Sequence, residues 1–287
     1  MKHRTVGIWL VLFLSASVSL PAQFRSDVRL VEVYASVYDR RGIPVDNLPV
    51  ERFRVLDEGH PQPIVSFESA SDALSCAIVI DTTGSMRDSL GSVRNAVSSL
   101  LDQLRPDDAV AVYGFSTSLR ILQDFTKDKA AAKKAVMNTR SGGATALFDA
   151  ISEASRQIAP RPGKKVMVLF TDGADNASQL APAAAINHAL KTGIPIYAVA
   201  EGDATREGQL LKQLRALARQ TGGLCYTAKN GHDVSKVFAD IQAELKHMYL
   251  ISYKPPAADA TKWRTIEISI AGAPEYKIRG KQGYFPD

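Results

Sequence analysis

The chain has 287 residues, of which 45% are hydrophobic and 23% charged, and its formal net charge is +5. A chain of this length can form one α/β domain of ordinary size together with a smaller companion. Its basic residues are scattered, without clusters or interleaved aromatic residues, so the composition argues against a nucleic-acid partner.

The first 22 residues have the layout of a secretory signal peptide. Basic residues at positions 2–4 precede an apolar run from Val6 to Leu14, and small residues lead to Ala22. The apolar run is too short for a bilayer span, which needs about 20 mostly apolar residues, although an uncleaved anchor stays open. We therefore expect an exported protein, periplasmic or extracellular. Cleavage would remove Lys2 and Arg4, lowering the net charge by two to +3, and would leave no stable membrane span.

Residues 73–246 alternate short apolar runs with segments of helical period. This alternation predicts an α/β fold: a doubly wound, mostly parallel, Rossmann-like sheet with helices on both faces. The second and third runs are close enough to pair as a hairpin at one edge of the sheet. The predicted strands are Leu74–Ile80, Ala109–Phe115, Leu119–Leu122, Val166–Phe170, Ile194–Ala200 and Leu224–Thr227.

On both sides of this region the hydrophobic pattern changes to a period of two. Apolar residues alternate with more polar ones at Val31, Val33, Ala35 and Val37, and again at Ile266, Ile268 and Ile270. Such alternation is typical of half-buried antiparallel strands, and neither flank has enough strands to be stable alone. We therefore predict that residues 26–70 and 248–287 join into one small antiparallel β domain.

Cys76 and Cys225 are the only cysteines, and export could expose them to oxidation. Both lie in runs predicted as buried strands, three places apart in this sheet. At about 4.8 Å a step, that separation is roughly 14 Å, beyond the limit of roughly 7 Å between the Cα atoms of a disulfide. We predict two buried free thiols.

Three segments place hydroxyl and carboxyl groups beside the predicted carboxyl ends of the strands, where open α/β sheets bind ligands. They are Asp81–Ser85, Ser141–Thr145 and Thr171–Gly173. Two carboxylates and several hydroxyls, with no histidine or cysteine nearby, suit Mg²⁺, Mn²⁺ or Ca²⁺ and disfavour Zn²⁺. Octahedral Mg²⁺ would keep one position for a carboxylate from outside.

These segments resemble the metal-ion-dependent adhesion site (MIDAS) of von Willebrand factor A (VWA) domains, whose first motif is Asp-x-Ser-x-Ser. Here Thr83 replaces the first serine and keeps its hydroxyl. The resemblance implies that Thr83 and Ser85 coordinate a divalent cation, and that Thr145 does so in the form that engages ligand. It also implies that Asp81 and Asp172 act mainly through bound water.

Several of these polar residues have a second interpretation. Thr145 also fits a simple helix cap, and Ser141 could take its place at the ion. Asp149, one helical turn after Thr145, fits either a supporting role at the site or a surface or capping role. Asp175 and Asn176 could contact water at the site, or could serve only a turn.

The flanks resemble a bacterial VWA-related family in which the A domain is embedded in a β extension. The segments that carry this resemblance are Val37–Gly42, Phe53–Gly59 and Arg279–Tyr284. The implied layout is a signal peptide over residues 1–22, a VWA domain over 73–246, and a β extension in two parts on either side.

We therefore expect a binding module and not an enzyme, in which the cation joins the site to an exposed acidic residue of a partner protein. One alternative is a scaffold of the cell envelope, in which the metal only stabilises loops. Another is a phosphotransferase, because Asp81–Ser85 superficially resembles the Asp-Lys-Thr-Gly-Thr motif of P-type ATPases. Most related phosphatases have a second acidic residue two positions after the aspartate, and this sequence has Thr83 there.

Overall fold

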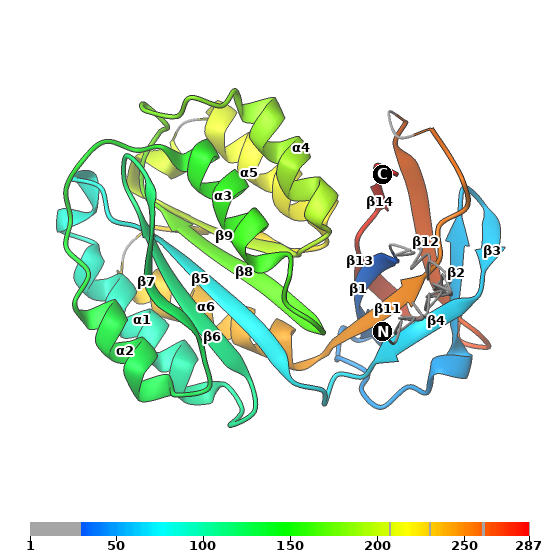
Figure 1. The fold of residues 1–287 in the computed structure, drawn as a ribbon. Helices are drawn as coiled ribbons and strands as arrows, with labels where there is room; N and C mark the ends of the chain where they lie inside the picture. Colours follow the sequence, from blue (N-terminus) through cyan, green and yellow to red (C-terminus); the bar gives the residue numbers. More distant parts are fainter. Residues whose placement is uncertain (1–29, 207, 230, 260–261, 287) are drawn as a thin grey trace, which may run out of the picture.

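The computed structural model describes residues 30–206, 208–229, 231–259 and 262–286, so the predicted signal peptide lies outside the described residues. Figure 1 shows two bodies, a sheet covered by helices and a smaller body built from strands. The chain passes between them twice, from β4 to β5 and from α6 to β11. Within the described part, none of the helices has the length and apolar character needed to cross a bilayer.

The larger body is built on a six-stranded sheet with the strand order β10-β9-β8-β5-β6-β7. Every pair is parallel except β6 with β7, which forms the predicted edge hairpin. All residues of β5 and β8 are buried, as expected for strands covered on both faces. The bounds are β5 (Leu74–Asp81), β6 (Ala109–Phe115), β7 (Leu119–Thr126), β8 (Lys164–Thr171), β9 (Ile196–Glu201) and β10 (Cys225–Ala228).

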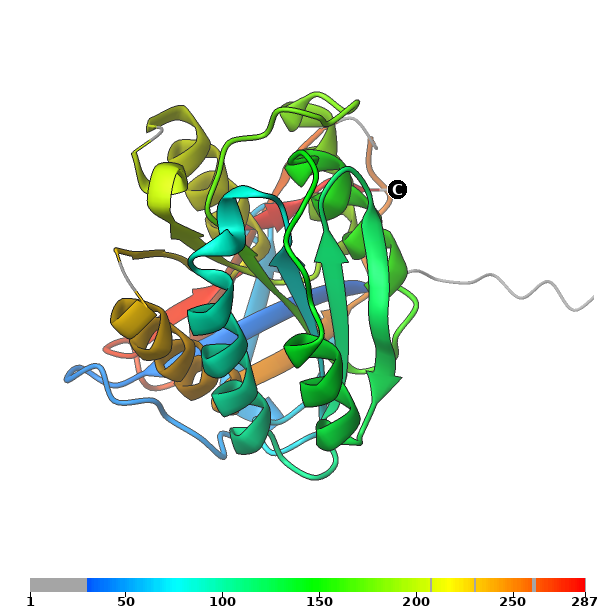
Figure 2. The ribbon, with the colours of Figure 1, turned by 90° about the vertical axis from the view of Figure 1, so that its left-hand side faces the viewer.

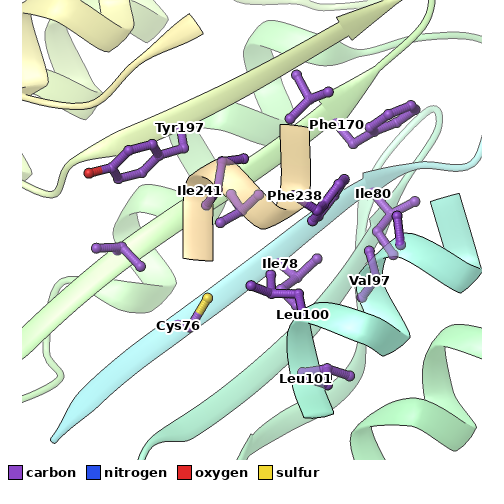
Figure 3. Packing of buried hydrophobic residues seen from close by; sticks show 14 of the residues in the cluster. Cys76, Ile78, Ile80, Val97, Leu100, Leu101, Phe170, Tyr197, Phe238 and Ile241 are labelled. Carbon is purple, nitrogen blue, oxygen red and sulfur yellow. The ribbon is translucent and has the colours of Figure 1, made fainter. Parts of the chain in front are cut away.

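Helices cover both faces of this sheet (Figure 2). One face packs against α1 (Leu90–Gln103), α2 (Lys129–Met137) and α6 (Gly231–Lys246). The other packs against α3 (Leu147–Ile158), α4 (Pro182–Thr192) and α5 (Gly208–Thr221). In Figure 3, side chains of α1 and α6 lie over the central strands, among them Val97, Leu100, Phe238 and Ile241 against Ile78 and Ile80.

The smaller body consists of two four-stranded antiparallel sheets, with the orders β13-β1-β11-β4 and β14-β12-β2-β3. Their apolar side chains share one core, to which both ends of the chain contribute. β1 pairs with β11 and β2 with β12, so neither flank forms these sheets alone. The bounds are β1 (Val31–Tyr38), β2 (Phe53–Asp57), β3 (His60–Gln62), β4 (Ile64–Glu68), β11 (Met248–Tyr253), β12 (Arg264–Ile270), β13 (Lys277–Gly280) and β14 (Gly283–Tyr284).

The predicted fold class is therefore confirmed, with local differences. The strand predicted over Leu119–Leu122 runs on to Thr126, because β7 is a half-exposed edge strand with no continuous apolar run. Both cysteines are free, as predicted, but only Cys76 is buried. Cys225 is partly exposed because β10 forms the opposite edge of the sheet.

Candidate functional site

The site begins at Asp81, the last residue of the central strand β5. Its carboxylate is fully buried and accepts two hydrogen bonds, from the Thr83 amide at 2.9 Å and the Thr171 hydroxyl at 2.8 Å. Both donors are neutral. Burial raises the pKa of Asp81 above its ordinary value, and these hydrogen bonds offset the rise only in part. The strand end therefore holds a carboxylate for which these bonds supply no positive charge.

A chain of hydrogen bonds joins the first segment to the third. The hydroxyls of Thr83 and Ser85 lie 3.0 Å apart, and the Ser85 hydroxyl donates to Asp172 Oδ1 at 2.9 Å. Ser85 begins a short 3-10 helix, η2 (Ser85–Arg87), and is exposed, whereas Thr83 and Asp172 are buried. The two segments thus gather oxygen atoms that reach from the protein interior to the surface.

The second segment is fastened to the first through its backbone. The Gly142 amide donates to Thr82 O at 2.8 Å, and the Gly84 amide donates to Gly143 O at 3.3 Å. Gly143 has a φ of +91°, and a Cβ there would lie 3.1 Å from the Cβ of Ser116. A glycine is therefore required for this close approach, which carries the chain to Thr145 beside the other two segments.

Thr145 is buried, and its backbone is fixed by the loop that follows β8. Its amide donates to the Asn176 side chain at 2.8 Å, and its carbonyl accepts from the Asn176 amide at 3.0 Å. Its hydroxyl makes no hydrogen bond within the described part of the chain. Thr145, Ser85 and Asp172 line one pocket of about 450 Å³. The structure therefore brings the three segments to a common cavity.

The alternative role of Thr145 as a helix cap is wrong. Helix α3 begins two residues later, at Leu147, and no side chain of its own cap residue closes it. Instead the Ser178 hydroxyl accepts from the amides of Phe148 and Asp149 at 3.0 and 3.1 Å. The competing residue Ser141 lines a different pocket. A cap supplied from a distant loop leaves the Thr145 hydroxyl available to the cavity.

Asp149 and Asp175 hold the loop after β8 in place. The Asp149 carboxylate accepts from the amides of Gln179 and Leu180, each at 2.9 Å. Asp175 accepts from the Ser178 amide at 3.2 Å and also from its hydroxyl. Both aspartates therefore position the loop that carries Asn176. This corresponds to the supporting interpretation of Asp149 and to the turn interpretation of Asp175.

Glu201, the last residue of β9, also lines the pocket, although we did not predict it. Burial raises the pKa of its carboxyl, and the nearby charge of Asp172 raises it further. The exposed Lys229 is the only basic side chain that lines the pocket within the described residues. The same rule that located Asp81, an acidic residue at the carboxyl end of a parallel strand, would have found Glu201.

The described residues contain no group of three or more His, Cys, Asp or Glu side chains arranged to hold a metal. A cation at this pocket would therefore depend on hydroxyl oxygens as well as carboxylates. Such an all-oxygen set fits a hard cation and does not fit Zn²⁺ or Cu²⁺.

Comparison with known families identifies the larger body. The model of the von Willebrand factor type A domain matches residues 76–240, more than half of the chain. The chain belongs to the VWA family. The match spans the chain from β5 to α6, so the pocket lies within the VWA domain.

Solved structures show the same fold. The von Willebrand factor type A protein from Catenulispora acidiphila is 15% identical, with a TM-score of 0.54, and the match covers 87% of this chain and 72% of that one. The proximal thread matrix protein 1 of the mussel byssus is 22% identical, with a TM-score of 0.53, and the match covers 65% of this chain and 49% of that one.

A third similar structure is the vWF domain of the type V pili tip protein Mfa5 from Porphyromonas gingivalis. It is 14% identical, with a TM-score of 0.52, and the match covers 60% of this chain and 95% of that one. A search of the curated proteins found no match. At these identities the similarities establish the VWA fold and no particular partner.

Proposed function

We propose that this protein is a cation-dependent protein-binding module that engages an acidic residue of its partner at the VWA pocket. The observation that carries the proposal is the convergence of Ser85, Thr145 and Asp172 on one pocket. Asp81 lies fully buried behind them, and the hydrogen bonds that it accepts come from neutral groups. A buried carboxylate without a positive partner is costly, and a cation taken from solvent would relieve that cost.

The donor set supports Mg²⁺, with Mn²⁺ or Ca²⁺ as substitutes. The hydroxyls of Thr83, Ser85 and Thr145 would hold the ion together with the charges of Asp81 and Asp172. When bound, the ion would supply a concentrated positive charge that attracts a carboxylate. Ser85 is exposed, and Lys229 adds a second positive group at the pocket. These features favour an acidic side chain as the group recognised.

Export to the periplasm or cell exterior is part of the same proposal, because the first 22 residues resemble a signal peptide. The similar Mfa5 domain comes from a pilus tip protein. A role of this chain in adhesion or assembly at the cell surface would suit such a relative.

The phosphotransferase alternative loses support from the position of Asp81. A nucleophilic carboxylate must reach its substrate, whereas this side chain is fully buried and both of its oxygens accept hydrogen bonds. The envelope scaffold remains a distinct alternative, because loops stabilised by metal would need no acidic partner.

The test is retention of a partner from envelope extract by the immobilised chain, in Mg²⁺ and in chelator. Ser85→Ala removes one exposed hydroxyl at the pocket, and Ser66→Ala, on an exposed position of β4, is the matched control. We expect retention in Mg²⁺ by the wild type and by Ser66→Ala, with loss in chelator and in Ser85→Ala.

Two other results would contradict the proposal in different ways. Retention that survives chelation would rule out a bond through the cation. Stabilisation of the fold by Mg²⁺ without any chelator-sensitive partner would favour the scaffold.

A further inference from the structure

The second segment, Ser141–Thr145, contributes to a second pocket at the same edge of the sheet. This pocket has a volume of about 380 Å³ and is lined by residues 116–118 of the turn between β6 and β7, by Arg120 and by residues 140–142. Thr145, at the other end of the segment, lines the VWA pocket. The two pockets therefore flank one short stretch of chain, so one bound partner can contact both.

Two arginines supply the charge of this second pocket, which we call the arginine pocket. Arg120 and Arg140 are exposed, and neither forms an ion pair with another described residue. None of the described residues that line the pocket is acidic. A guanidinium presents its N–H donors in a planar fork that fits the two oxygens of a carboxylate. The arginine pocket therefore suits an anion, and the hydroxyls of the turn offer further donors.

The turn that forms one wall of the arginine pocket is packed against the first and second segments. The Ser116 carbonyl accepts from the Ala146 amide at 2.8 Å, and the Thr82 hydroxyl donates to Phe115 O at 2.8 Å. A Cβ at Gly143 would lie 3.2 Å from the Ser116 hydroxyl. Ser116 is 9% exposed, and its hydroxyl makes no hydrogen bond to another described residue. These contacts fix the arginine pocket relative to the VWA pocket and leave the Ser116 hydroxyl available to a ligand.

Both arginines extend from backbone that is itself held in place. Arg120 pairs with Gly114 across β6 and β7. Arg140 follows the buried Thr139, whose hydroxyl accepts from Arg94 Nε at 3.2 Å. The position of their positive charge is therefore set by the fold, while the exposed ends of the side chains can adjust to a ligand.

We propose that the arginine pocket binds a second carboxylate of the partner, so that the segment recognised carries at least two acidic residues. This inference rests on the proposed function, because it names the kind of partner that the VWA pocket engages. One carboxylate would reach the cation, and the other would reach Arg120 and Arg140. The arginine pocket needs no metal, so its contribution to binding does not depend on the cation.

The experiment measures, by fluorescence anisotropy in Mg²⁺, the binding of two peptides of equal length with blocked ends. One peptide is hexaglutamate, and the other has a single glutamate among glycines. The test variant is Arg120→Gln/Arg140→Gln. Its matched control, Arg215→Gln/Arg219→Gln, removes the same charge from two exposed arginines of α5 that line neither of the two pockets.

We expect the wild type to bind hexaglutamate more tightly than the one-glutamate peptide. Hexaglutamate binding should weaken roughly fivefold to tenfold in Arg120→Gln/Arg140→Gln, as for the loss of two exposed ion pairs. The one-glutamate peptide should bind this variant within about twofold of the wild type, because it uses the cation alone. A variant that failed to fold would lose both peptides. The control variant should bind both peptides as the wild type does.

The possible outcomes separate this inference from the function on which it rests. Equal binding of hexaglutamate by the wild type and by Arg120→Gln/Arg140→Gln would overturn the arginine pocket, and release of both peptides by chelator would leave the cation bond standing. Equal weakening in the control variant would also overturn the arginine pocket, since general attraction between charges would then be the cause. Binding of both peptides that survives chelator would instead overturn the proposed function, and a loss confined to Arg120→Gln/Arg140→Gln would then still support the arginine pocket.

Discussion

Two buried aspartates, Asp57 in the smaller body and Asp81 in the VWA domain, end their strands in opposite electrostatic settings. Both are fully buried. Asp57 accepts from Arg264 Nε at 2.7 Å and from the hydroxyls of Tyr253 and Tyr284 at 2.8 and 2.7 Å. Asp81 accepts from the Thr83 amide and from the Thr171 hydroxyl, both neutral groups.

This difference in hydrogen-bond partners distinguishes a structural ion pair from a candidate binding site. At Asp57 the chain provides its own counterion, so strands β2, β11, β12 and β14 are tied together without help from solvent. At Asp81 the hydrogen bonds come from neutral groups of the described residues. A buried carboxylate without a positive partner is unfavourable, so we infer that a cation from solvent balances the charge of Asp81.

The largest effect that we predict comes from neutralising each aspartate in turn, in chelator. Asp57→Asn should lower the free energy of unfolding by on the order of 3 kcal/mol, because it leaves the partly buried Arg264 without its counterion and disturbs a fully buried network. Asp81→Asn should change it little or raise it, because no salt bridge is broken and an uncompensated charge is removed. Urea denaturation of both variants measures the difference.

Equal losses of unfolding free energy in the two variants would contradict this comparison. Asp81 would then have a counterion supplied by the chain itself. Repeating the measurement in Mg²⁺ sharpens it. Asp81→Asn should then be the less stable protein relative to the wild type, and the deficit of Asp57→Asn should stay the same.

A smaller effect is expected at Thr145. At a Mg²⁺ concentration one hundred times the Kd, binding should stabilise the wild type by about 2.7 kcal/mol. Thr145→Val keeps the shape of the side chain and removes its hydroxyl. If that weakens Mg²⁺ binding tenfold, the gain falls by about 1.4 kcal/mol, while stability in chelator stays near that of the wild type. Thermal unfolding with and without Mg²⁺ measures both quantities.

Thr117→Val, on the exposed loop beside the second segment, is the control for Thr145→Val and should keep the full gain. An undiminished gain in Thr145→Val would exclude its hydroxyl from the site. A large loss of stability in chelator would instead assign Thr145 a structural role, as the cap interpretation had.

These residues also show how far the sequence alone can go. The strand ends at Asp81 and Asp172 were predictable because long apolar runs precede them and parallel strands share one carboxyl edge. The start of α3 was misplaced, because its cap comes from Ser178, about thirty positions away in the sequence. Glu201 was open to the same rule, because it directly follows the predicted strand Ile194–Ala200, but no short motif surrounds it and we did not single it out.

The division of the smaller body into two sheets could not be predicted from the residue pattern of any single segment either. Alternation reveals β1 and β12, but every residue of β11 is buried, so its sequence lacks the alternation by which we recognised an antiparallel strand. Its place in the centre of one sheet depends on pairing with β1 and β4. Long-range pairing of this kind has no signature within a single segment.

The smallest effect concerns Lys164, where the chain buries a cation at the junction of the two bodies. Its ammonium donates to the carbonyls of Ser69, Ala70 and Met248 at 2.7, 3.2 and 3.4 Å. Ser69 and Ala70 lie on the connection from β4 to β5, and Met248 begins β11 just after the connection from α6. Burial, followed by the charge of Arg105, lowers the pKa of Lys164 to about 8. The chain therefore accommodates this charge with backbone carbonyls, as it accommodates Asp81 with neutral donors.

A lowered lysine pKa makes the stability rise with pH. Between the folded value near 8 and the ordinary value of 10.5, the unfolded chain binds more protons than the folded one, so raising the pH favours folding. From pH 7 to pH 9 the wild type should gain on the order of 1 kcal/mol relative to Lys164→Met. The exposed Lys127→Met should show no such dependence. If the difference in free energy of unfolding between the wild type and Lys164→Met stays constant over this range, the pKa of Lys164 is not lowered by folding. Burial of the ammonium at the junction would then carry no electrostatic penalty.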